Sequence, residues 1–272
     1  MSDLGGYEPG LSEDYFCTPN SARIWNFLMG GKDNFTVDRA SAEEALEIFP
    51  ELRTVARRSR AFLIRAVRYL AGEAGIRQFL DIGPGLPNEQ NTHQVAHAVA
   101  PDSRIVYVDN DPMVLLYARS LLDDEPGHRL VRYVQEDMRN PELVVGQGRQ
   151  LLDLTQPVAV ILSGVLGHVV DYDESVTIVR TVMDALPSGS YLVQQDGTDT
   201  DGDNVVAHDK YNGTGGPAYL LRSPELMCRY FDGLELLEPG YVPITQWRPP
   251  LTVVGGEQPR PIPQYGGIGR KP

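Results

Sequence analysis

Residues 79–87 read FLDIGPGLP, in which a short apolar run meets an acidic residue and a turn with two glycines. Glycines at such a turn let a ligand approach the backbone closely, and in doubly wound α/β proteins ligands bind at the carboxyl edge of the sheet. The dinucleotide fingerprint GxGxxG needs a glycine at position 88, where this chain has Asn88. The stretch therefore predicts a β-strand that ends at a ligand site, and it disfavours a pyrophosphate cradle at that turn.

Apolar runs and helical patterns alternate from residue 76 onward. The runs that we expect to form buried strands cover 77–82, 104–108, 131–134, 158–162 and 191–194. Helical patterns fall between them at 92–100, 112–122, 141–148 and 173–186. This alternation is typical of a parallel sheet with helices on both faces, so the sequence predicts an α/β fold.

The C-terminal third of the chain completes this predicted core. We expect a polar loop at 196–216, long enough to suggest a function, and then a helix at 224–231. A sixth strand is expected at 234–242, bent or ended at Pro239-Gly240, and an edge strand at 265–270.

Three helical segments precede the first strand, at 21–28, 40–49 and 52–70. The third has a helical stripe made of Leu52, Val55, Ser59, Phe62, Ala66 and Leu70. Its arginines, which are Arg53, Arg57, Arg60 and Arg68, lie mostly elsewhere, and we interpret them as a solvated face in preference to an anion-binding surface. We expect residues 1–75 to form an N-terminal arm and helical cap, residues 76–272 to form the core, and the two to make one compact unit.

The composition is that of a folded acidic protein. The 272 residues include 24 Lys and Arg against 37 Asp and Glu, which gives a net charge of −13, and 42% are hydrophobic. A chain so acidic repels phosphate backbones, so no nucleic-acid partner is expected. The two cysteines exclude a disulfide framework and a CxxC metal site. No apolar run approaches the ~20 residues that span a bilayer, and no signal peptide is recognisable, so we expect a cytoplasmic protein without a membrane partner.

Two further strand ends carry residues suited to a nucleoside. Asp109, followed by Asn110, ends the second predicted strand, and a carboxylate there can accept both hydroxyls of a ribose. Asp137 and Met138 follow the third strand, where an acceptor and an apolar side chain suit an exocyclic amine and a purine face. Taken alone, each feature is better explained as a turn glycine or a strand-end cap. Together with Asp81, Gly83 and Gly85 they predict a nucleoside site.

At these positions the chain resembles the class I S-adenosylmethionine-dependent methyltransferases. It is similar in particular to an actinobacterial methyltransferase-like family long labelled a domain of unknown function. The similar segments are SARIWNFLMGGKDNF at 21–35, the stretch 79–87, residues 107–112, LPSGSY at 186–191 and YGGIGRKP at 265–272. The resemblance covers nearly the whole chain and implies a Rossmann-like, seven-stranded, mostly parallel sheet with an antiparallel last strand and an N-terminal helical cap.

The resemblance also implies S-adenosylmethionine as cofactor. It places Gly83 and Gly85 against the methionine part, Asp109 against the ribose and Asp137 against the adenine. Ser163 and Gly164, after the fourth strand, are then expected to line the methionine or acceptor end.

Two groups of residues suggest chemistry beyond cofactor binding. His168 is a candidate base for an acceptor hydroxyl or amine, although a loop histidine that only makes hydrogen bonds explains it equally well. The polar segment 30–38 is expected to fold over the cofactor, with Arg23, Asn26 and Lys32 near the cofactor carboxylate or the acceptor. The alternative is a capping network that anchors the arm.

The predicted function is methyl transfer to a small-molecule acceptor. The chain lacks the Asn/Asp-Pro-Pro-Tyr-like tetrapeptide of nucleic-acid amino methyltransferases, and no metal is expected. The alternative is a regulatory or interaction protein that binds the cofactor without turnover. A nicotinamide oxidoreductase is disfavoured by Asn88 and by the methyltransferase-like ending. The sequence specifies neither the acceptor nor the oligomeric state.

Overall fold

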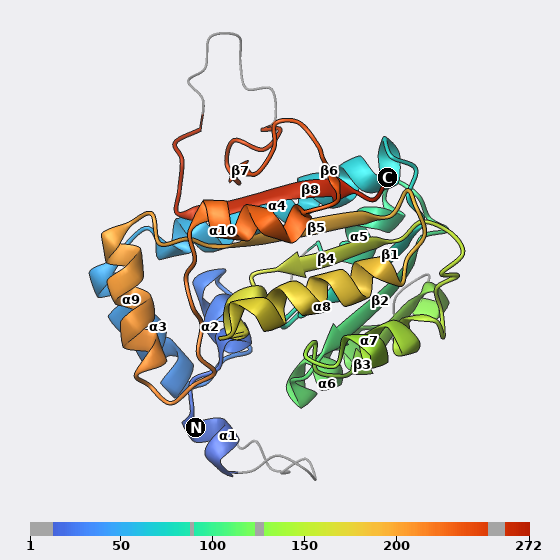
Figure 1. The fold of residues 1–272 in the computed structure, drawn as a ribbon. Helices are drawn as coiled ribbons and strands as arrows, with labels where there is room; N and C mark the ends of the chain where they lie inside the picture. The colour runs from blue at the N-terminus through green and yellow to red at the C-terminus, as the bar shows by residue number, and fades with distance from the viewer. Residues whose placement is uncertain (1–12, 88–89, 123–127, 250–258) are drawn as a thin grey trace.

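The centre of the protein is a twisted sheet that is covered on both faces (Figure 1). The structure is a computed structural model and describes residues 13–87, 90–122, 128–249 and 259–272. The sheet order is β3-β2-β1-β4-β5-β8-β6, and the first five strands are parallel. Their bounds are Gln78–Ile82 for β1, Arg104–Asp109 for β2, Val131–Gln135 for β3, Ala159–Ser163 for β4 and Tyr191–Gly197 for β5. The predicted α/β fold with a mostly parallel sheet is therefore confirmed.

The C-terminal strands complete the sheet. The antiparallel strand β8, Gln264–Arg270, lies between β5 and the short strands β6, Glu235–Leu236, and β7, Val242–Pro243. The antiparallel last strand is confirmed, but its placement at the edge is wrong, because β6 and β7 cover its outer side. These two are the halves of the predicted sixth strand, divided by a turn in which Gly240 has a φ of +97°. Because they pair with the same side of β8, eight strands occupy the seven expected positions.

Two apolar clusters cover the two faces of the sheet. One face packs against the cap helices α2, Ser21–Leu28, and α3, Thr36–Ile48, together with α4, Leu52–Gly72, and α5, Thr92–His97. The other packs against α7, Pro141–Gly148, α8, Tyr172–Asp184, and α10, Pro224–Cys228, with the short η3, Arg229–Phe231. Alternate residues of each strand enter opposite clusters, as the two-residue period of a strand requires. The helix α6, Pro112–Leu122, contacts β2 and β3.

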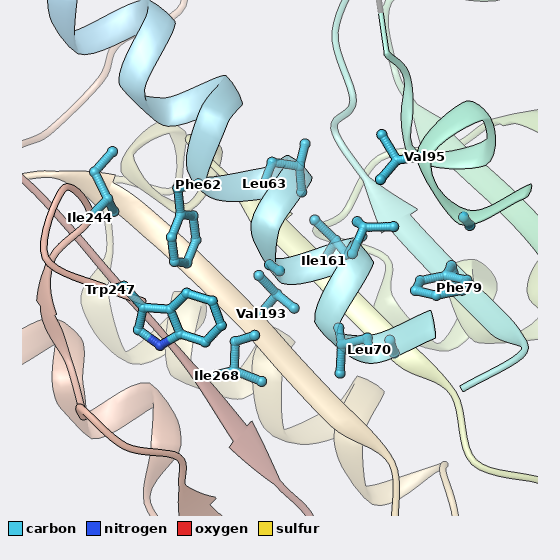
Figure 2. Close-up of a cluster of buried hydrophobic side chains, with 14 of the residues drawn as sticks. Phe62, Leu63, Leu70, Phe79, Val95, Ile161, Val193, Ile244, Trp247 and Ile268 are labelled. Atoms are coloured by element: carbon cyan, nitrogen blue, oxygen red, sulfur yellow. The ribbon is translucent and has the colours of Figure 1, made fainter. Parts of the chain in front are cut away.

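The helix α4 joins the cap to the sheet. All six residues of its predicted stripe are buried, and Phe62 is 0% exposed. Figure 2 shows Phe62 facing Trp247, with ring centroids 5.4 Å apart, in a cluster that includes Val193 and Ile268 of the sheet. One apolar cluster therefore contains residues of both the cap and the sheet.

The predicted polar loop at 196–216 is wrong, because it contains the helix α9, Gly202–Asn212. Asp201 caps this helix by accepting a hydrogen bond from the Asn204 amide at 3.0 Å. The helix lies beside α3 (Figure 1), with Ala207 buried and Lys210 paired with Glu44 at 3.2 Å. A cap and tertiary packing stabilise a helix that has almost no apolar periodicity of its own.

Among the described residues, none of the helices combines the length and the apolar character that crossing a membrane requires.

Candidate functional site

A cavity of about 350 Å³ lies where β1, β2, β4 and β5 end and the cap begins. We call it the strand-end cavity. Nine of the ten residues predicted for cofactor binding or catalysis line it, namely Asp81, Gly83, Gly85, Asp109, Asn110, Met138, Ser163, Gly164 and His168. Residues separated by almost ninety positions in the sequence are thus brought to one site by the parallel strands.

The glycine turn has the backbone geometry that only glycine adopts freely. Gly83 and Gly85 have φ values of +70° and +68°. The Gly83 amide donates to the Val108 carbonyl at 2.7 Å, and the Gly85 amide donates to Asp109 Oδ2 at 3.2 Å. A Cβ on Gly83 would stand 2.4 Å from Cγ1 of Val165, so the loop after β4 also requires glycine here. Hydrogen bonds thus hold the turn against the end of β2, and it packs closely against the loop after β4.

Two carboxyl groups, those of the buried Asp81 and the half-buried Asp109, give the strand-end cavity its acidic character. Burial raises the pKa of Asp109 to about 6, although Oδ1 accepts the Asp111 amide at 2.9 Å and Oδ2 accepts the Gly85 amide. Burial also raises the pKa of Asp81 to about 6, against a 2.6 Å hydrogen bond from the Thr92 hydroxyl. Perturbed carboxyl groups that face one cavity are typical of a functional site.

Asp137 is the one residue of these ten that does not line the strand-end cavity. It is one hydrogen bond away, because Asn110 Nδ2 donates to Asp137 Oδ2 at 3.3 Å. Its other partner is Arg139, at 3.3 Å. Met138 does line the cavity, as does Glu136, which the sequence analysis did not single out. The end of β3 thus contributes both a polar and an apolar wall.

His168 is held as one neutral tautomer, with the proton on Nδ1. Its Nδ1 lies 2.7 Å from the Ala218 carbonyl oxygen, which can only accept, so Nδ1 carries the proton and Nε2 the lone pair. Burial lowers the pKa of this imidazole, so the neutral form prevails at pH 7. In the part of the chain that the structure describes, Nε2 has no hydrogen-bond partner. His168 therefore lines the strand-end cavity as a neutral imidazole with one unpaired nitrogen.

Arg222 holds the loop that carries His168, and the sequence analysis did not identify it. Its guanidinium donates to the Leu166 carbonyl at 2.9 Å and to the carbonyls of Val169 and Val170. It is 7% exposed. A buried guanidinium with several carbonyl acceptors fixes this loop on either side of His168.

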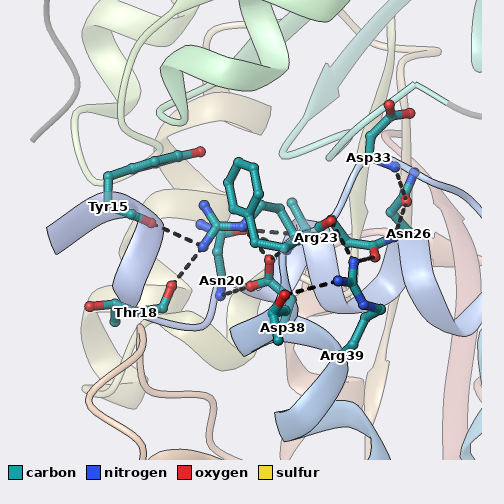
Figure 3. Close-up of polar contacts among 12 residues, drawn as sticks. Tyr15, Thr18, Asn20, Arg23, Asn26, Asp33, Asp38 and Arg39 are labelled. Carbon is teal, nitrogen blue, oxygen red and sulfur yellow. Dashed lines mark hydrogen bonds and ion pairs between the residues drawn. The ribbon is translucent and has the colours of Figure 1, made fainter. Parts of the chain in front are cut away.

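The three cap residues predicted to reach the cofactor do not line the strand-end cavity, and Figure 3 shows the contacts of two of them, Arg23 and Asn26. Arg23, 1% exposed, pairs with Asp38 at 2.7 Å and donates to the Thr18 carbonyl at 2.6 Å. Asn26 Oδ1 accepts from the Asp33 amide at 3.0 Å. Neither side chain lines the strand-end cavity, nor does the exposed Lys32. Arg23 and Asn26 occupy an internal network of the cap, as the anchoring alternative describes.

Other cap residues do enclose the strand-end cavity, including Asn20, Ser21 and Trp25. The arm is tied to the end of β2, because the Tyr15 hydroxyl donates to Asp111 Oδ1 at 2.6 Å and Asn20 Nδ2 donates to Oδ2 at 3.1 Å. The cap thus contacts the residue two positions after Asp109.

The helix α4 contributes a cation to this cavity, Arg60, so the interpretation of all its arginines as a solvated face is wrong for this residue. Ala56, Ser59, Arg60 and Leu63 line the strand-end cavity at spacings of three and four residues. Arg60 makes no ion pair or hydrogen bond within the described residues, and burial lowers the pKa of its guanidinium. The buried Ser59 hydroxyl also has no hydrogen-bond partner there. The signal in the sequence was an arginine on the same i, i+3, i+4, i+7 face as these small and apolar residues.

The fold and the strand-end cavity are those of a class I methyltransferase. Residues 15–272 match a family model described as S-adenosyl methyltransferase, so the chain belongs to this family. Its methyl donor is S-adenosylmethionine.

Two solved structures are similar over nearly the whole chain. A Thermobifida fusca protein named as a candidate methyltransferase is 40% identical, covers 97% of each chain and has a TM-score of 0.87. A DUF574 family protein from Streptomyces avermitilis is 38% identical, covers 94% of this chain and 99% of its own, and has a TM-score of 0.87. The mitomycin 7-O-methyltransferase MmcR, 17% identical with a TM-score of 0.50 over 92% of this chain and 68% of its own, shares the fold alone. A comparison with curated proteins finds no match.

Proposed function

We propose that the protein transfers the methyl group of S-adenosylmethionine to a hydroxyl or amino group of a small, largely apolar acceptor, with His168 as the base. The observation that carries this proposal is the unpartnered Nε2 of His168, which lines the same cavity as the glycine turn and Asp109. A neutral imidazole with one nitrogen fixed and the other free is suited to accept a proton from an acceptor.

The strand-end cavity offers groups that fit each part of S-adenosylmethionine. The unpaired Arg60 and the Ser59 hydroxyl suit the carboxylate of the amino acid part, and Asp81 suits its ammonium group. Asp109 suits the ribose hydroxyls. Asn110, Asp137 and Met138 suit the adenine. Gly83, Gly85, Ser163 and Gly164 leave room for the methionine chain, and an added Cβ on Gly164 would meet nothing within 4 Å.

The chemistry demands little of the protein beyond alignment and proton removal. The bound cofactor supplies an electrophilic methyl group on a sulfonium. His168 takes the proton of the acceptor on Nε2 while its Nδ1–H keeps donating a hydrogen bond to the Ala218 carbonyl, so the ring keeps its orientation. Arg222 holds the loop on either side of the histidine, which keeps Nε2 in reach of the acceptor.

An apolar acceptor is favoured by the walls near His168. Val170, 59% exposed, lies there together with Pro217 and Ala218, and all three line the strand-end cavity. The net charge of −13 disfavours a nucleic-acid acceptor.

Binding and turnover test the proposal separately. Calorimetric titration with S-adenosylmethionine and S-adenosylhomocysteine should give micromolar binding that is lost in Asp109→Ala. A panel of phenols and aryl amines with radiolabelled methyl donor should give a product whose rate falls by 10²–10⁴-fold in His168→Gln, with cofactor affinity kept. Cofactor binding without product from any acceptor would favour the regulatory alternative. Equal rates for His168→Gln and the parent protein would remove the base from this role.

A further inference from the structure

One peptide group connects His168 to the helix α9. The carbonyl of this peptide, that of Ala218, accepts the hydrogen bond from His168 Nδ1 at 2.7 Å. Its N–H, that of Tyr219, donates to Oδ1 of Asn212, the last residue of α9, at 2.8 Å. Because a peptide group is planar, a side chain that fixes the N–H also fixes the direction of the C=O. The acceptor that selects the tautomer of His168 is therefore oriented from α9.

Asn212 holds the backbone of Tyr219 at two points. Besides accepting from the Tyr219 amide, its side chain donates from Nδ2 to the Tyr219 carbonyl at 3.0 Å. The hydrogen bonds from the imidazole to the peptide and from the peptide to Oδ1 run in series, and hydrogen bonds in series strengthen one another. The next amide, that of Leu220, donates to the Gly167 carbonyl at 2.8 Å, so this segment is also joined to the residue before His168. The peptide therefore has little freedom to turn its carbonyl away from Nδ1.

The side chain of Tyr219 packs against the imidazole ring itself. The two ring centroids lie 5.0 Å apart, with the ring planes at 83°. The Tyr219 hydroxyl donates to Oδ1 of Asp196, which is 1% exposed, at 2.6 Å. A Cβ on Gly167 would stand 2.6 Å from the Tyr219 ring, so the ring also contacts the residue before His168. Because a charge-assisted hydrogen bond to a buried carboxylate holds the tyrosine, the space left for the imidazole ring is fixed.

The side chains of Asn212, Tyr219 and Asp196 do not line the strand-end cavity, so they can act on its chemistry only through His168. We propose that Asn212 and Tyr219 are positioning residues that hold His168 as the Nδ1–H tautomer in one ring orientation, Asn212 through the Ala218–Tyr219 peptide and Tyr219 through its ring. The consequence for catalysis rests on the proposed function of His168 as the base, because Nε2 has to be unprotonated to accept a proton. The tautomer itself can be measured without an acceptor or a cofactor.

Nitrogen NMR of the free protein tests the tautomer. The full chain is labelled with ¹⁵N-histidine, and long-range ¹H–¹⁵N correlation spectra distinguish the protonated from the unprotonated ring nitrogen. The signals of His168 are those that His168→Gln lacks. We expect the parent protein to have Nδ1 protonated and Nε2 unprotonated. Asn212→Ala, which removes both hydrogen bonds of the side chain, should make His168 a mixture of tautomers, so that its two nitrogen shifts approach each other.

A second variant and a control separate positioning from a purely structural role. Tyr219→Phe keeps the ring and removes its hydrogen bond to Asp196, so the same change should follow to a smaller extent. Lys210→Ala is the matched control, because it truncates an exposed side chain in the last turn of α9 and should keep the parent spectrum. A purely structural role would lower the urea unfolding midpoint and leave the His168 shifts unchanged. That result in both Asn212→Ala and Tyr219→Phe, or a parent protein with the proton on Nε2, would overturn the proposal.

Turnover distinguishes the positioning of His168 from its proposed role as the base. With an acceptor from the panel of phenols and aryl amines, we expect kcat of Asn212→Ala to fall roughly tenfold, the order of one or two lost neutral hydrogen bonds, while the KM for S-adenosylmethionine stays within twofold. A mixed tautomer with an unchanged kcat would remove His168 from the role of base, and its positioning by Asn212 and Tyr219 would stand. Absence of product from every acceptor would concern the proposed function alone, because the spectra of the free protein decide whether these residues fix His168.

Discussion

At the scale of single residues, the contact expected between Arg60 and the cofactor carboxylate can be tested directly by ligand binding. We expect Arg60→Gln to weaken S-adenosylhomocysteine binding about tenfold or more, because a charge-assisted hydrogen bond contributes about 1.5–3 kcal/mol. Binding of 5′-methylthioadenosine, which lacks the carboxylate, should change by less than twofold. Calorimetry on both ligands measures the difference. Arg57→Gln, on the exposed face of the same helix, is the control. An equal loss for both ligands would mean that Arg60 supports the fold of the cavity instead.

Three aspartates, of which Asp81 and Asp196 are buried and Asp109 is half-buried, are expected to make the stability of the folded protein depend on pH. Burial raises the pKa of Asp81, Asp109 and Asp196 to about 6 each, above the unfolded value near 3.9. At these three groups the folded protein binds more protons than the unfolded chain between pH 4 and 6, so their contribution to stability falls as the pH rises through this window.

Burial lowers the pKa of His168 and His208, and these two groups act in the opposite direction, so a variant has to isolate one carboxyl group. In urea unfolding we expect Asp196→Asn to gain about 1 kcal/mol of stability relative to the parent protein between pH 5 and pH 7, because the variant lacks the group whose protonation stabilises the fold at pH 5. A difference between parent and variant that stays constant from pH 5 to pH 7 would contradict the raised pKa of Asp196.

The residue types at strand ends were predictable, but their partners were not. Asp109 and the two glycines could be assigned from spacing, because each follows a recognisable strand. Arg23 and Arg60 show the limit of this reasoning. Arg23 pairs with Asp38 inside the cap, whereas Arg60 lines the strand-end cavity. Only the three-dimensional arrangement of the helices distinguishes the two arginines.

At the scale of elements, the arm formed by α1, Glu13–Cys17, and the start of α2 is attached to the site by Asp111. We expect Tyr15→Phe to loosen this attachment by about 1 kcal/mol, the net value of one hydrogen bond. S-adenosylhomocysteine should then dissociate severalfold faster with little change in association rate, which stopped-flow fluorescence measures. Tyr191→Phe is the control, because Tyr191 begins β5 at the end of the sheet away from the strand-end cavity. An unchanged dissociation rate would separate the arm from ligand retention.

Local pattern predicted most strands and helices of this chain, but it did not predict α9. The first four strands begin and end within one residue of their predicted ranges, because each is a nearly continuous apolar run. The helix α9 was missed because its sequence is polar almost all round. Its stability depends on the Asp201 cap and on α3, which lies more than 150 residues earlier in the chain. Local pattern cannot reveal a helix that tertiary contacts stabilise.

At the scale of the whole molecule, we propose that the cap, residues 1–75, and the core, residues 76–272, unfold together. A single apolar cluster joins Phe62 of α4 to Trp247 and to Val193 and Ile268 of the sheet (Figure 2). Separating the two parts would expose this face of the sheet to water, at about 25 cal/mol for each Å² of apolar surface.

One cooperative transition should therefore be seen in urea. Circular dichroism, which reports all helices, and tryptophan fluorescence, which reports Trp25 in the cap and Trp247 at the junction, should give the same midpoint. Phe62→Ala should lower the free energy of unfolding by about 3–5 kcal/mol in both signals, because a fully buried ring leaves a cavity. If Phe62→Ala shifted only the fluorescence and left a second helical transition at the parent midpoint, the cap would be an independent unit. Coincident shifts would mean that the helices which enclose the strand-end cavity cannot unfold without the sheet.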